Sequence, residues 1–418
     1  MDRLNENEVM IKNRKLFLFV SICMIAAFII RLIEVEIHDY TKLTLQSFNM
    51  SEFLINYQGG FVRRGLFGEG LYHLYTLLGF PLRPTIMVFS LTVYLLVLGF
   101  FIYQFREHKY CWWLILSPLF MGMQEFIIRK DYLLYAVLIG ILYLLRKEAS
   151  LRNVLACLIL VISIMVHEAF FLWCIPIYTL LLWSEKRKRV LNFFLIVIPV
   201  FAFLLMSYFK GSPAVADAIN DSWNAIVPGQ PLLYDGQSSI GALGWNTLET
   251  FKWHLSVNAG EGGAGVVLVP LIVLGAYYLF TNFMYAFRKA SEEEKRKSRL
   301  ALSLVYSVTF IFLIPMFTFL SCDVGRVMQY LVVVTISSFL IIPSDRLISI
   351  FPTWYVNGIK RVNSHLISFL PPNKGVLILL LLFLSIRGCM FSVLSCWTCS
   401  VVGTLWHGPI RLFHLFIM

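Results

Sequence analysis

The sequence predicts an all-α, polytopic integral membrane protein in which a single transmembrane domain covers residues 1–418. Of the 418 residues, 59% are hydrophobic and only 14% are charged. Apolar runs of about 17–25 residues, the length that crosses a bilayer, recur along the chain. A soluble protein of this size has too little interior to hide so much apolar surface. We therefore expect about 11 transmembrane helices joined by polar loops.

The distribution of basic residues predicts which loops share a side of the membrane. Lys12, Arg14 and Lys15 precede the first apolar run, and no clear cleavage site follows it, so we expect a retained span and a cytoplasmic N-terminus. In that register about 23 of the 35 Lys and Arg fall in cytoplasmic loops and about 10 in outer loops. This bias accounts for the net charge of +11 without a nucleic-acid partner.

The predicted spans follow one another along the chain with loops on alternating sides. Residues 388–418 are apolar but contain Gly and Pro, and they fit a twelfth span, a re-entrant piece or an interfacial tail. The spans lie near 16–34, 85–103, 110–124, 132–145, 153–166, 169–183, 190–208, 264–285, 300–320 and 327–343, and the last begins near Gly375.

The first long outer segment, residues 35–84, contains the most unusual motif. Residues 56–69 read NYQGGFVRRGLFGE, with Arg63 and Arg64 between glycines and Tyr57 close by. Guanidinium groups bind phosphate oxygens in pairs, and glycines permit left-handed backbone and the close approach of amides to a ligand. The motif predicts an anion site, with contact between the two arginines and lipid headgroups as the alternative.

An amphipathic helix is expected to follow this motif and to lie at the membrane interface. Its apolar residues recur at helical spacing over 66–78, and Gly79 ends it. Glu69 and His73 are four residues apart and share a face, either as an acid/base pair or as an ordinary surface contact. The second long outer segment, residues 209–263, is rich in Gly, Pro, Asn and Asp.

A second outer motif lies between the third and fourth spans. It contains Glu125, Arg129 and Lys130, and the next residue, Asp131, is placed to cap the following helix. Positive charge outside runs against the topology rule, so Arg129 and Lys130 predict a second phosphate contact.

Two further motifs are expected at outer helix ends. His167 and Glu168 interrupt an apolar sequence, and they predict either a buried histidine or a general base oriented by a carboxylate. Asp323 and Arg326 are spaced i, i+3, which fits either an intrahelical ion pair or a role for Arg326 on a leaving phosphate. Ionisable groups at membrane depth are costly, so several at one face predict a site.

No metal or cofactor is predicted. Cys396 and Cys399 form a CxxC, but no second Cys pair or His cluster accompanies it.

Taken together, the arginine-rich outer loop, the outer His-Glu and the late Asp-x-Gly-Arg resemble bacterial O-antigen or capsule repeat-unit polymerases (Wzy type). More broadly, they resemble GT-C-like membrane glycosyltransferases. The resemblance covers most of the chain as architecture, while the matching motifs are short. GT-C enzymes usually keep an acidic residue in the first outer loop. Here Asp39 or Glu52 fits that role, but Asn56 stands at the most expected place, which favours a polymerase.

The resemblance implies a reaction at the outer face of a bacterial inner membrane. An acceptor hydroxyl attacks the anomeric carbon of a glycan carried on undecaprenyl diphosphate, and the lipid diphosphate leaves. His167, Glu168 or Asp323 would serve as base. The residues that would hold diphosphate or glycan are Tyr57, Arg63, Arg64, Glu69, Glu125, Arg129, Lys130 and Arg326.

Two other functions remain open from the sequence. A GT-C-like transferase would add one sugar from a polyprenyl phosphate donor, and a flippase would line a path through mid-membrane with charges. The expected partners are the lipid-linked oligosaccharide and membrane lipids, with a flippase and a chain-length regulator as protein partners in the polymerase case. No nucleic acid is expected.

Overall fold

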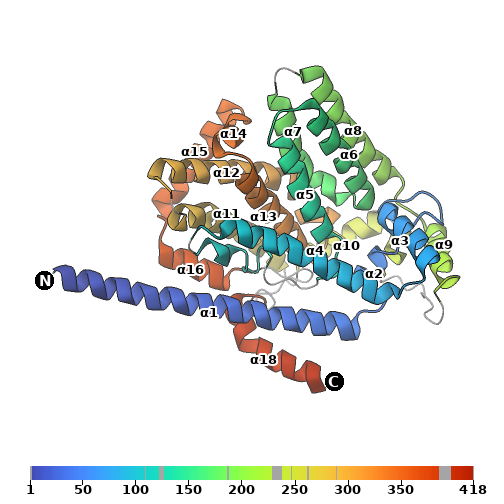
Figure 1. Ribbon diagram of the computed structural model, residues 1–418, viewed down its shortest axis with the longest axis horizontal. Helices are drawn as coiled ribbons and strands as arrows, with labels where there is room; N and C mark the ends of the chain where they lie inside the picture. Colours follow the sequence, from blue (N-terminus) through green and yellow to red (C-terminus); the bar gives the residue numbers. More distant parts are fainter. Residues whose placement is uncertain are drawn as a thin grey trace.

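The chain folds into helices packed around a central apolar core (Figure 1). The computed structural model describes residues 2–108, 110–121, 127–185, 188–227, 238–245, 247–260, 263–288, 290–385 and 397–417. Within these ranges every regular element is helical and none is a strand, which agrees with the all-α prediction.

Six helices are long and apolar enough to cross a membrane. They are α1 (Asp2–Lys42), α4 (Leu82–Phe105), α8 (Arg189–Tyr208), α11 (Ala264–Phe287), α12 (Glu292–Pro315) and α13 (Val324–Ile341). In α1 the apolar part begins at Arg14, and α12 continues directly into a π-helix, η5 (Met316–Leu320). The most deeply buried of the six is α13.

Three shorter apolar helices occupy predicted spans four, five and six. They are α5 (Asp131–Leu145), α6 (Ser150–Val166) and α7 (Ala169–Ser184), and the longest has 17 residues. At 1.5 Å per residue they reach about 22–26 Å, short of the roughly 30 Å hydrocarbon core. The helical segments therefore agree with the sequence prediction, whereas the count of about 11 full spans is not reproduced.

The clearest departure from the predicted spans is at residues 110–124, where no long helix forms in the described part. Residues 110–121 make successive turns, with one 3-10 helix, η1 (Cys111–Leu114). Their apolar side chains are buried, including Trp113 and Phe120. The segment has the composition of a span, but Pro118 prevents helix continuation, and the turns pack into the core instead.

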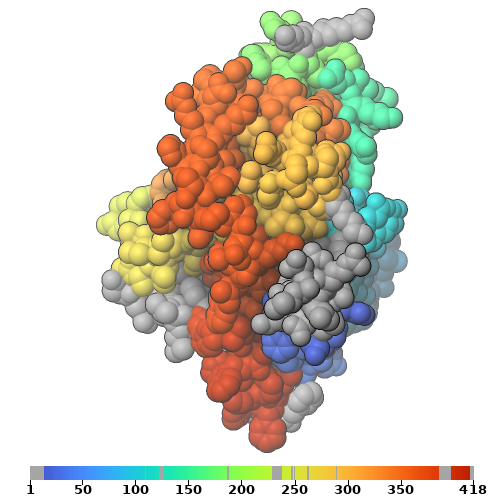
Figure 2. Space-filling model, turned by 90° about the vertical axis from the view of Figure 1, so that its left-hand side faces the viewer, coloured from blue at the N-terminus to red at the C-terminus, as the bar shows by residue number. Residues whose placement is uncertain are grey.

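The C-terminal part bends instead of spanning in one piece. α15 (Thr353–Phe369) follows the short α14 (Ser344–Ser349), and α16 (Lys374–Phe383) then turns away from α15 by 99°. α18 (Val401–Ile417) lies along α1, with the red C-terminal residues beside the blue helix in Figure 2. Of the uncertain segment 388–418, residues 388–396, with Cys396, are outside the described ranges.

The two segments predicted to be outer loops fold together into one cap. We call residues 43–80, 213–227 and 238–245 the loop cap, because they share a second apolar core that includes Phe53, Val62 and Trp223. The Trp223 indole Nε1 donates to the Leu54 carbonyl at 2.7 Å. Its helices are α2 (Phe48–Glu52), α3 (Gly65–Leu78), α9 (Pro213–Asn224) and η3 (Gly241–Gly244).

The helix predicted at 66–78 is confirmed as α3, which ends at the left-handed Gly79. Beyond the loop cap, α10 (Thr247–Ala259) packs against η5. The Asn258 amide donates to carbonyls of this π-turn, at 2.9 Å for Thr318 and 2.6 Å for Ser321. The turn leads directly into Asp323, so α10 supports the start of α13 from the side.

Candidate functional site

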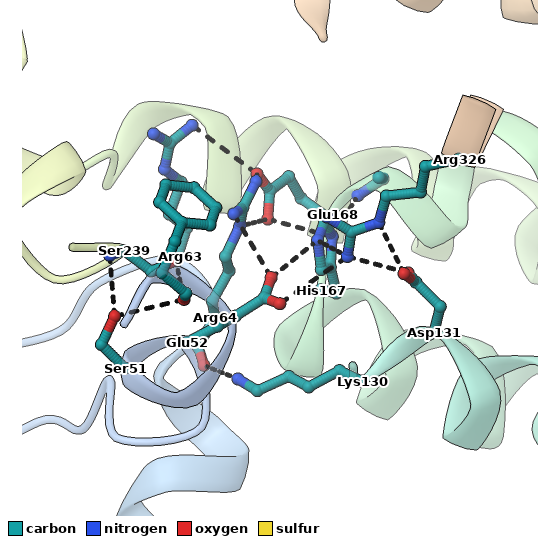
Figure 3. Close-up of polar contacts among 12 residues, drawn as sticks. Ser51, Glu52, Arg63, Arg64, Lys130, Asp131, His167, Glu168, Ser239 and Arg326 are labelled. Carbon is teal, nitrogen blue, oxygen red and sulfur yellow. Dashed lines mark hydrogen bonds and ion pairs between the residues drawn. The ribbon is translucent and has the colours of Figure 1, made fainter. Parts of the chain in front are cut away.

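Charged residues from four separated segments meet where the loop cap contacts the ends of α5, α6, α7 and α13 (Figure 3). The segments are the first loop, the turn before α5, the α6–α7 junction and the start of α13. We call this set the ion cluster. Its members are Glu52, Arg63, Arg64, Arg129, Lys130, Asp131, His167, Glu168, Asp323 and Arg326.

Arg64 and Glu168 form the two-pronged ion pair at the centre of the cluster. Arg64 Nη2 lies 2.6 Å and Nε 2.9–3.0 Å from the Glu168 carboxylate oxygens. Arg64 caps α3 with a left-handed backbone, at φ 65°, an uncommon conformation for a residue with a side chain. A strained backbone of this kind persists only where its surroundings hold it, and such positions concentrate at functional sites.

Glu52 ties three parts of the cluster together. Its side chain is 1% exposed, and its oxygens lie 3.1 Å from His167 Nε2 and 3.5 Å from Arg64 Nη1. The second oxygen lies 3.7 Å from Arg326. In the sequence Glu52 stands out only as an acidic residue of the first loop. The apolar residues FLI that follow it are the one signal that it is buried.

Arg326 pairs with Asp131 across the bundle. Arg326 Nε and Nη2 lie 2.5 and 2.9 Å from the two Asp131 oxygens, and the Tyr330 hydroxyl donates to the same carboxylate at 2.6 Å. The sequence predicted that Asp131 caps α5, but Asp131 pairs with Arg326 instead, and no side chain caps that helix. The prediction failed because a buried guanidinium is a stronger partner for a carboxylate than a backbone N–H.

Asp323 and Arg326 do not form the intrahelical ion pair that their i, i+3 spacing allowed. Asp323 caps α13 by accepting the Arg326 backbone N–H at 3.0 Å. Its second oxygen lies 3.0 Å from Arg129 Nη2. Each of the two arginines thus pairs with a carboxylate from the other segment, and the α5 turn is joined to the start of α13 twice.

Lys130 is completely buried, with 0% exposure. Its ammonium donates to the Arg64 carbonyl at 3.2 Å and lies over the Phe67 ring. Burial lowers the pKa of Lys130 to about 8. In this structure Lys130 faces the Arg64 backbone, which places it beneath the left-handed turn instead of at the surface of the cluster.

Arg63 is the most exposed cation of the cluster. Its side chain is 32% exposed, and its one ionic contact among the described residues is a long one, 3.6 Å from Nη1 to Glu168. Its Nε is buried without a hydrogen-bond partner. Figure 3 shows Glu168 between the guanidinium groups of Arg63 and Arg64, with Arg63 at the edge of the group. Arg63 is therefore the cation that an incoming anion reaches at the least cost.

Two predicted residues, Tyr57 and Glu69, lie outside the cluster's contacts. Glu69 accepts the Tyr57 backbone N–H at 2.8 Å and lies 2.9 Å from His73, so the expected shared face is confirmed as a surface contact of α3. Burial, and then Glu69, raises the pKa of Tyr57 to about 12, and its hydroxyl is buried without a partner. Glu125 lies outside the described residues.

The ring of His167 is occupied at both nitrogens. The Ala169 backbone N–H donates to Nδ1 at 3.2 Å, and Nε2 lies 3.1 Å from Glu52 and 3.3 Å from Arg326 Nη2. With Nδ1 as the acceptor the ring proton lies on Nε2 and is donated to Glu52, so Arg326 contacts Nε2 without donating a hydrogen bond to it. Burial, and then the Arg64 charge, lowers the pKa of His167 below 6.5. The histidine is a neutral bridge in this geometry, without the free lone pair that a general base needs.

The glycines of the first motif act mainly by allowing close packing. A Cβ on Gly65 would lie 2.3 Å from the Tyr57 ring, and one on Gly68 would lie 2.0 Å from the Ile55 carbonyl oxygen. Gly60, at φ 107°, is the one glycine of the motif that needs left-handed backbone. The sequence predicted left-handed glycines, but the other left-handed position in the loop is Arg64.

The charges of the cluster nearly balance. Its five cations face four carboxylates, which leaves one net positive charge beside a neutral His167. Burial alone would raise the pKa of Glu52 and Glu168. The neighbouring Arg326 and His167 hold the Glu52 pKa well below its usual range, and Arg64 does the same for Glu168.

These shifts predict a loss of stability on acidification in two steps. Because the folded pKa of His167 is below 6.5, the unfolded chain binds more protons as the pH falls from 6.5 through that lower value, and stability drops. The lowered carboxylate pKa values add a second loss below about pH 4.5. Melting temperatures of the detergent-purified protein from pH 8 to pH 4 measure both steps.

The variant His167→Gln should lose the first step and keep the second, because glutamine does not titrate. A melting temperature that is constant between pH 7 and pH 5 in the wild-type protein would contradict the buried neutral histidine.

Comparison with known proteins gives no relative. No family model matches the chain, and neither a curated protein nor a solved structure does.

Proposed function

We propose that the chain polymerises oligosaccharide repeat units carried on undecaprenyl diphosphate at the outer face of a bacterial inner membrane. The acceptor hydroxyl oxygen forms a bond to the anomeric carbon while the bond from that carbon to the diphosphate breaks. The hydroxyl proton passes to a protein base, and the lipid diphosphate leaves as an anion. Such a reaction needs fixed positive charge and a base, and it needs no metal where cations hold the diphosphate.

The observation that carries this proposal is that one accessible arginine, Arg63, lies beside buried arginines that already pair with carboxylates. Arg63 is 32% exposed and weakly paired, whereas Arg64 and Arg326 are held by close carboxylates. A diphosphate can bind the Arg63 guanidinium without breaking the Arg64–Glu168 or Arg326–Asp131 ion pairs. Groups fixed before substrate arrives need no reorganisation during the reaction, which is the main source of electrostatic catalysis.

The same geometry separates the three candidate bases. Both nitrogens of His167 are engaged, so we assign it a positioning role. Glu168 and Asp323 are 13% and 16% exposed and are the cluster carboxylates nearest to solvent. Of these two, Glu168 is beside Arg63, where the diphosphate would bind. Arg64 engages both Glu168 oxygens and lowers the Glu168 pKa, so Glu168 can act as base only once the incoming diphosphate draws Arg64 away from it. On that condition we favour Glu168 as base and Asp323 as the residue that positions Arg129 and α13.

A second candidate function is a GT-C-like transfer of one sugar from a polyprenyl phosphate, and Glu52 favours it. Such enzymes keep an acidic residue in the first outer loop, and Glu52 is the carboxylate of that loop that joins the cluster. Asn56, which the sequence placed at the expected position, instead bonds to Ser222 within the loop cap at 3.0 Å. The flippase alternative has no comparable support.

The product distinguishes these functions. Purified protein in detergent is mixed with the lipid-linked repeat units extracted from its host. A ladder of lengths supports the polymerase, and addition of a single sugar from a polyprenyl phosphate supports the second candidate. If neither product forms, and vesicles containing the protein move the lipid-linked glycan across the bilayer, both proposals fail.

We expect Arg63→Ala to raise KM for the lipid-linked donor about 10–100-fold, because one charge-assisted contact is worth about 1.5–3 kcal/mol. The free energy of unfolding should change by less than about 0.5 kcal/mol, since the Arg63 side chain is at the surface of the cluster. Arg106→Ala is the matched control, because Arg106 is 49% exposed and its one ion pair within the described part of the chain is with its neighbour Glu107. An unchanged KM in Arg63→Ala would remove Arg63 from the site.

A further inference from the structure

Four aromatic rings form a connected row beside Arg63. We call Tyr57, Phe61, Tyr208 and Phe209 the aromatic ledge. The Tyr57 and Phe61 rings stack with centroids 5.2 Å apart, and Phe61 meets Phe209 edge-on at 5.1 Å. Phe209 in turn meets Tyr208 at 5.1 Å. The row runs from the first loop to the end of α8.

The ledge is open on its outer side. Phe61 is 39% exposed and Tyr208 is 80% exposed. Gln58 and Lys210, which flank the ledge in sequence, are also exposed. Exposed aromatic rings at the end of an apolar helix also fit an interfacial belt, so the place of these rings beside Arg63 is what points to a ligand.

The backbone fixes the ledge to the cation site. The Arg63 backbone N–H donates to the Phe209 carbonyl at 2.8 Å, and Phe61 precedes Arg63 by two residues. Gly211, at φ 99°, allows the chain after Phe209 to pass against the loop cap, where a Cβ would lie 2.9 Å from Leu243. The backbone at Arg63 is therefore fixed relative to the backbone that carries Phe209.

We propose that the aromatic ledge is a sugar-binding subsite that holds the glycan ring next to the diphosphate. This inference rests on the proposed function. In the lipid-linked substrate the diphosphate is bonded to the sugar ring on one side and to the lipid on the other. A phosphate bound to Arg63 therefore places either the sugar ring or the lipid against the aromatic ledge. The C–H face of a sugar ring complements the negative π face of an aromatic ring, while the sugar hydroxyls need polar partners. The aromatic ledge supplies π faces, and the bordering Gln58 and Lys210 supply polar groups. A polyprenyl chain would use only the π faces.

Saturation-transfer NMR tests the subsite without any transfer reaction. The probe is the glycan released by mild acid from the host's lipid-linked repeat units, which has neither lipid nor diphosphate. Wild-type protein in detergent should give signals from the sugar C–H protons. Phe61→Leu keeps apolar bulk but removes the π face, so we expect Kd to rise about tenfold. Phe61→Tyr should bind as wild type, and so should the control Trp354→Leu, whose ring is 74% exposed on α15.

The outcomes keep the subsite separate from the proposed function. Equal Kd for Phe61→Leu and wild type, or no signal from wild type, overturns the subsite even where chain growth is normal. A subsite that binds glycan and weakens in Phe61→Leu stands on its own if no transfer product forms, and only the proposed function then fails. If Phe61→Leu changes the melting temperature in lipid nanodiscs but not Kd, the ledge is an interfacial anchor and the inference is wrong.

Discussion

Replacing Arg326 with alanine is expected to lower the free energy of unfolding by about 3–5 kcal/mol and to abolish glycan transfer. Arg326 and Asp131 have side-chain exposures of 13% and 3%, and they contact each other through two nitrogen–oxygen pairs. Removal of the guanidinium leaves the Asp131 carboxylate buried, with the Tyr330 hydroxyl as its remaining hydrogen-bond donor among the described side chains. An unpaired buried charge costs far more than the intact pair contributes. Chemical denaturation of the purified protein measures the loss.

A double variant separates the stabilising role of this pair from its role in the site. Arg326→Gln with Asp131→Asn removes both charges and leaves hydrogen-bonding groups in place, including an acceptor for Tyr330. We expect stability to return to within about 1–2 kcal/mol of wild type, since neutral replacement of a buried pair is tolerated. Transfer should stay absent, because the positive charge near Glu52 and His167 is gone. Wild-type activity in the double variant would limit Arg326 to a structural role.

The sequence predicted a helix correctly where the spacing of the apolar residues and a helix-ending residue both marked the same segment. The interfacial helix predicted at 66–78 is α3, because helical spacing and Gly79 both mark it. The predicted span at 110–124 was wrong, because hydrophobic composition does not distinguish a lipid-facing helix from a buried turn. The short α5 shows the same limit, since its side chains pack against α4, α6 and α13 and not only against lipid.

The sequence predicted most members of the ion cluster, apart from Glu52, but not their pairing. The topology placed Arg63, Arg129 and Arg326 on one face, and the structure connects each of them to the same ion cluster. The sequence could not show that each arginine already faces a carboxylate, because partners such as Asp131 and Arg326 are 195 residues apart. Local spacing favoured an Asp323–Arg326 pair, and the tertiary packing exchanged the partners.

Glu52→Gln is expected to reduce the turnover rate at saturating substrate about 10²–10³-fold, the usual effect of removing one preorganised electrostatic group. Glu52 is the common neighbour of Arg64, Arg326 and His167. Glutamine still accepts the His167 Nε2 proton but no longer balances the two arginines, so their guanidinium groups repel each other at the centre. KM should change little, because Arg63, which meets the substrate first, pairs with Glu168, whereas Glu52 pairs with Arg64, His167 and Arg326. The assay is initial rates of glycan transfer across donor concentrations.

A buried carboxylate elsewhere supplies the matched control. Glu34, 9% exposed on α1, pairs with Arg31 at 3.1 Å and Arg411 at 2.9 Å. Glu34→Gln removes a buried charge of the same type and should lower stability while leaving transfer unchanged. If both variants lose stability and activity to the same degree, the effect of Glu52→Gln is unfolding. If Glu52→Gln alone loses turnover while its denaturation curve matches that of Glu34→Gln, the carboxylate acts on the reaction through the charges it holds in place.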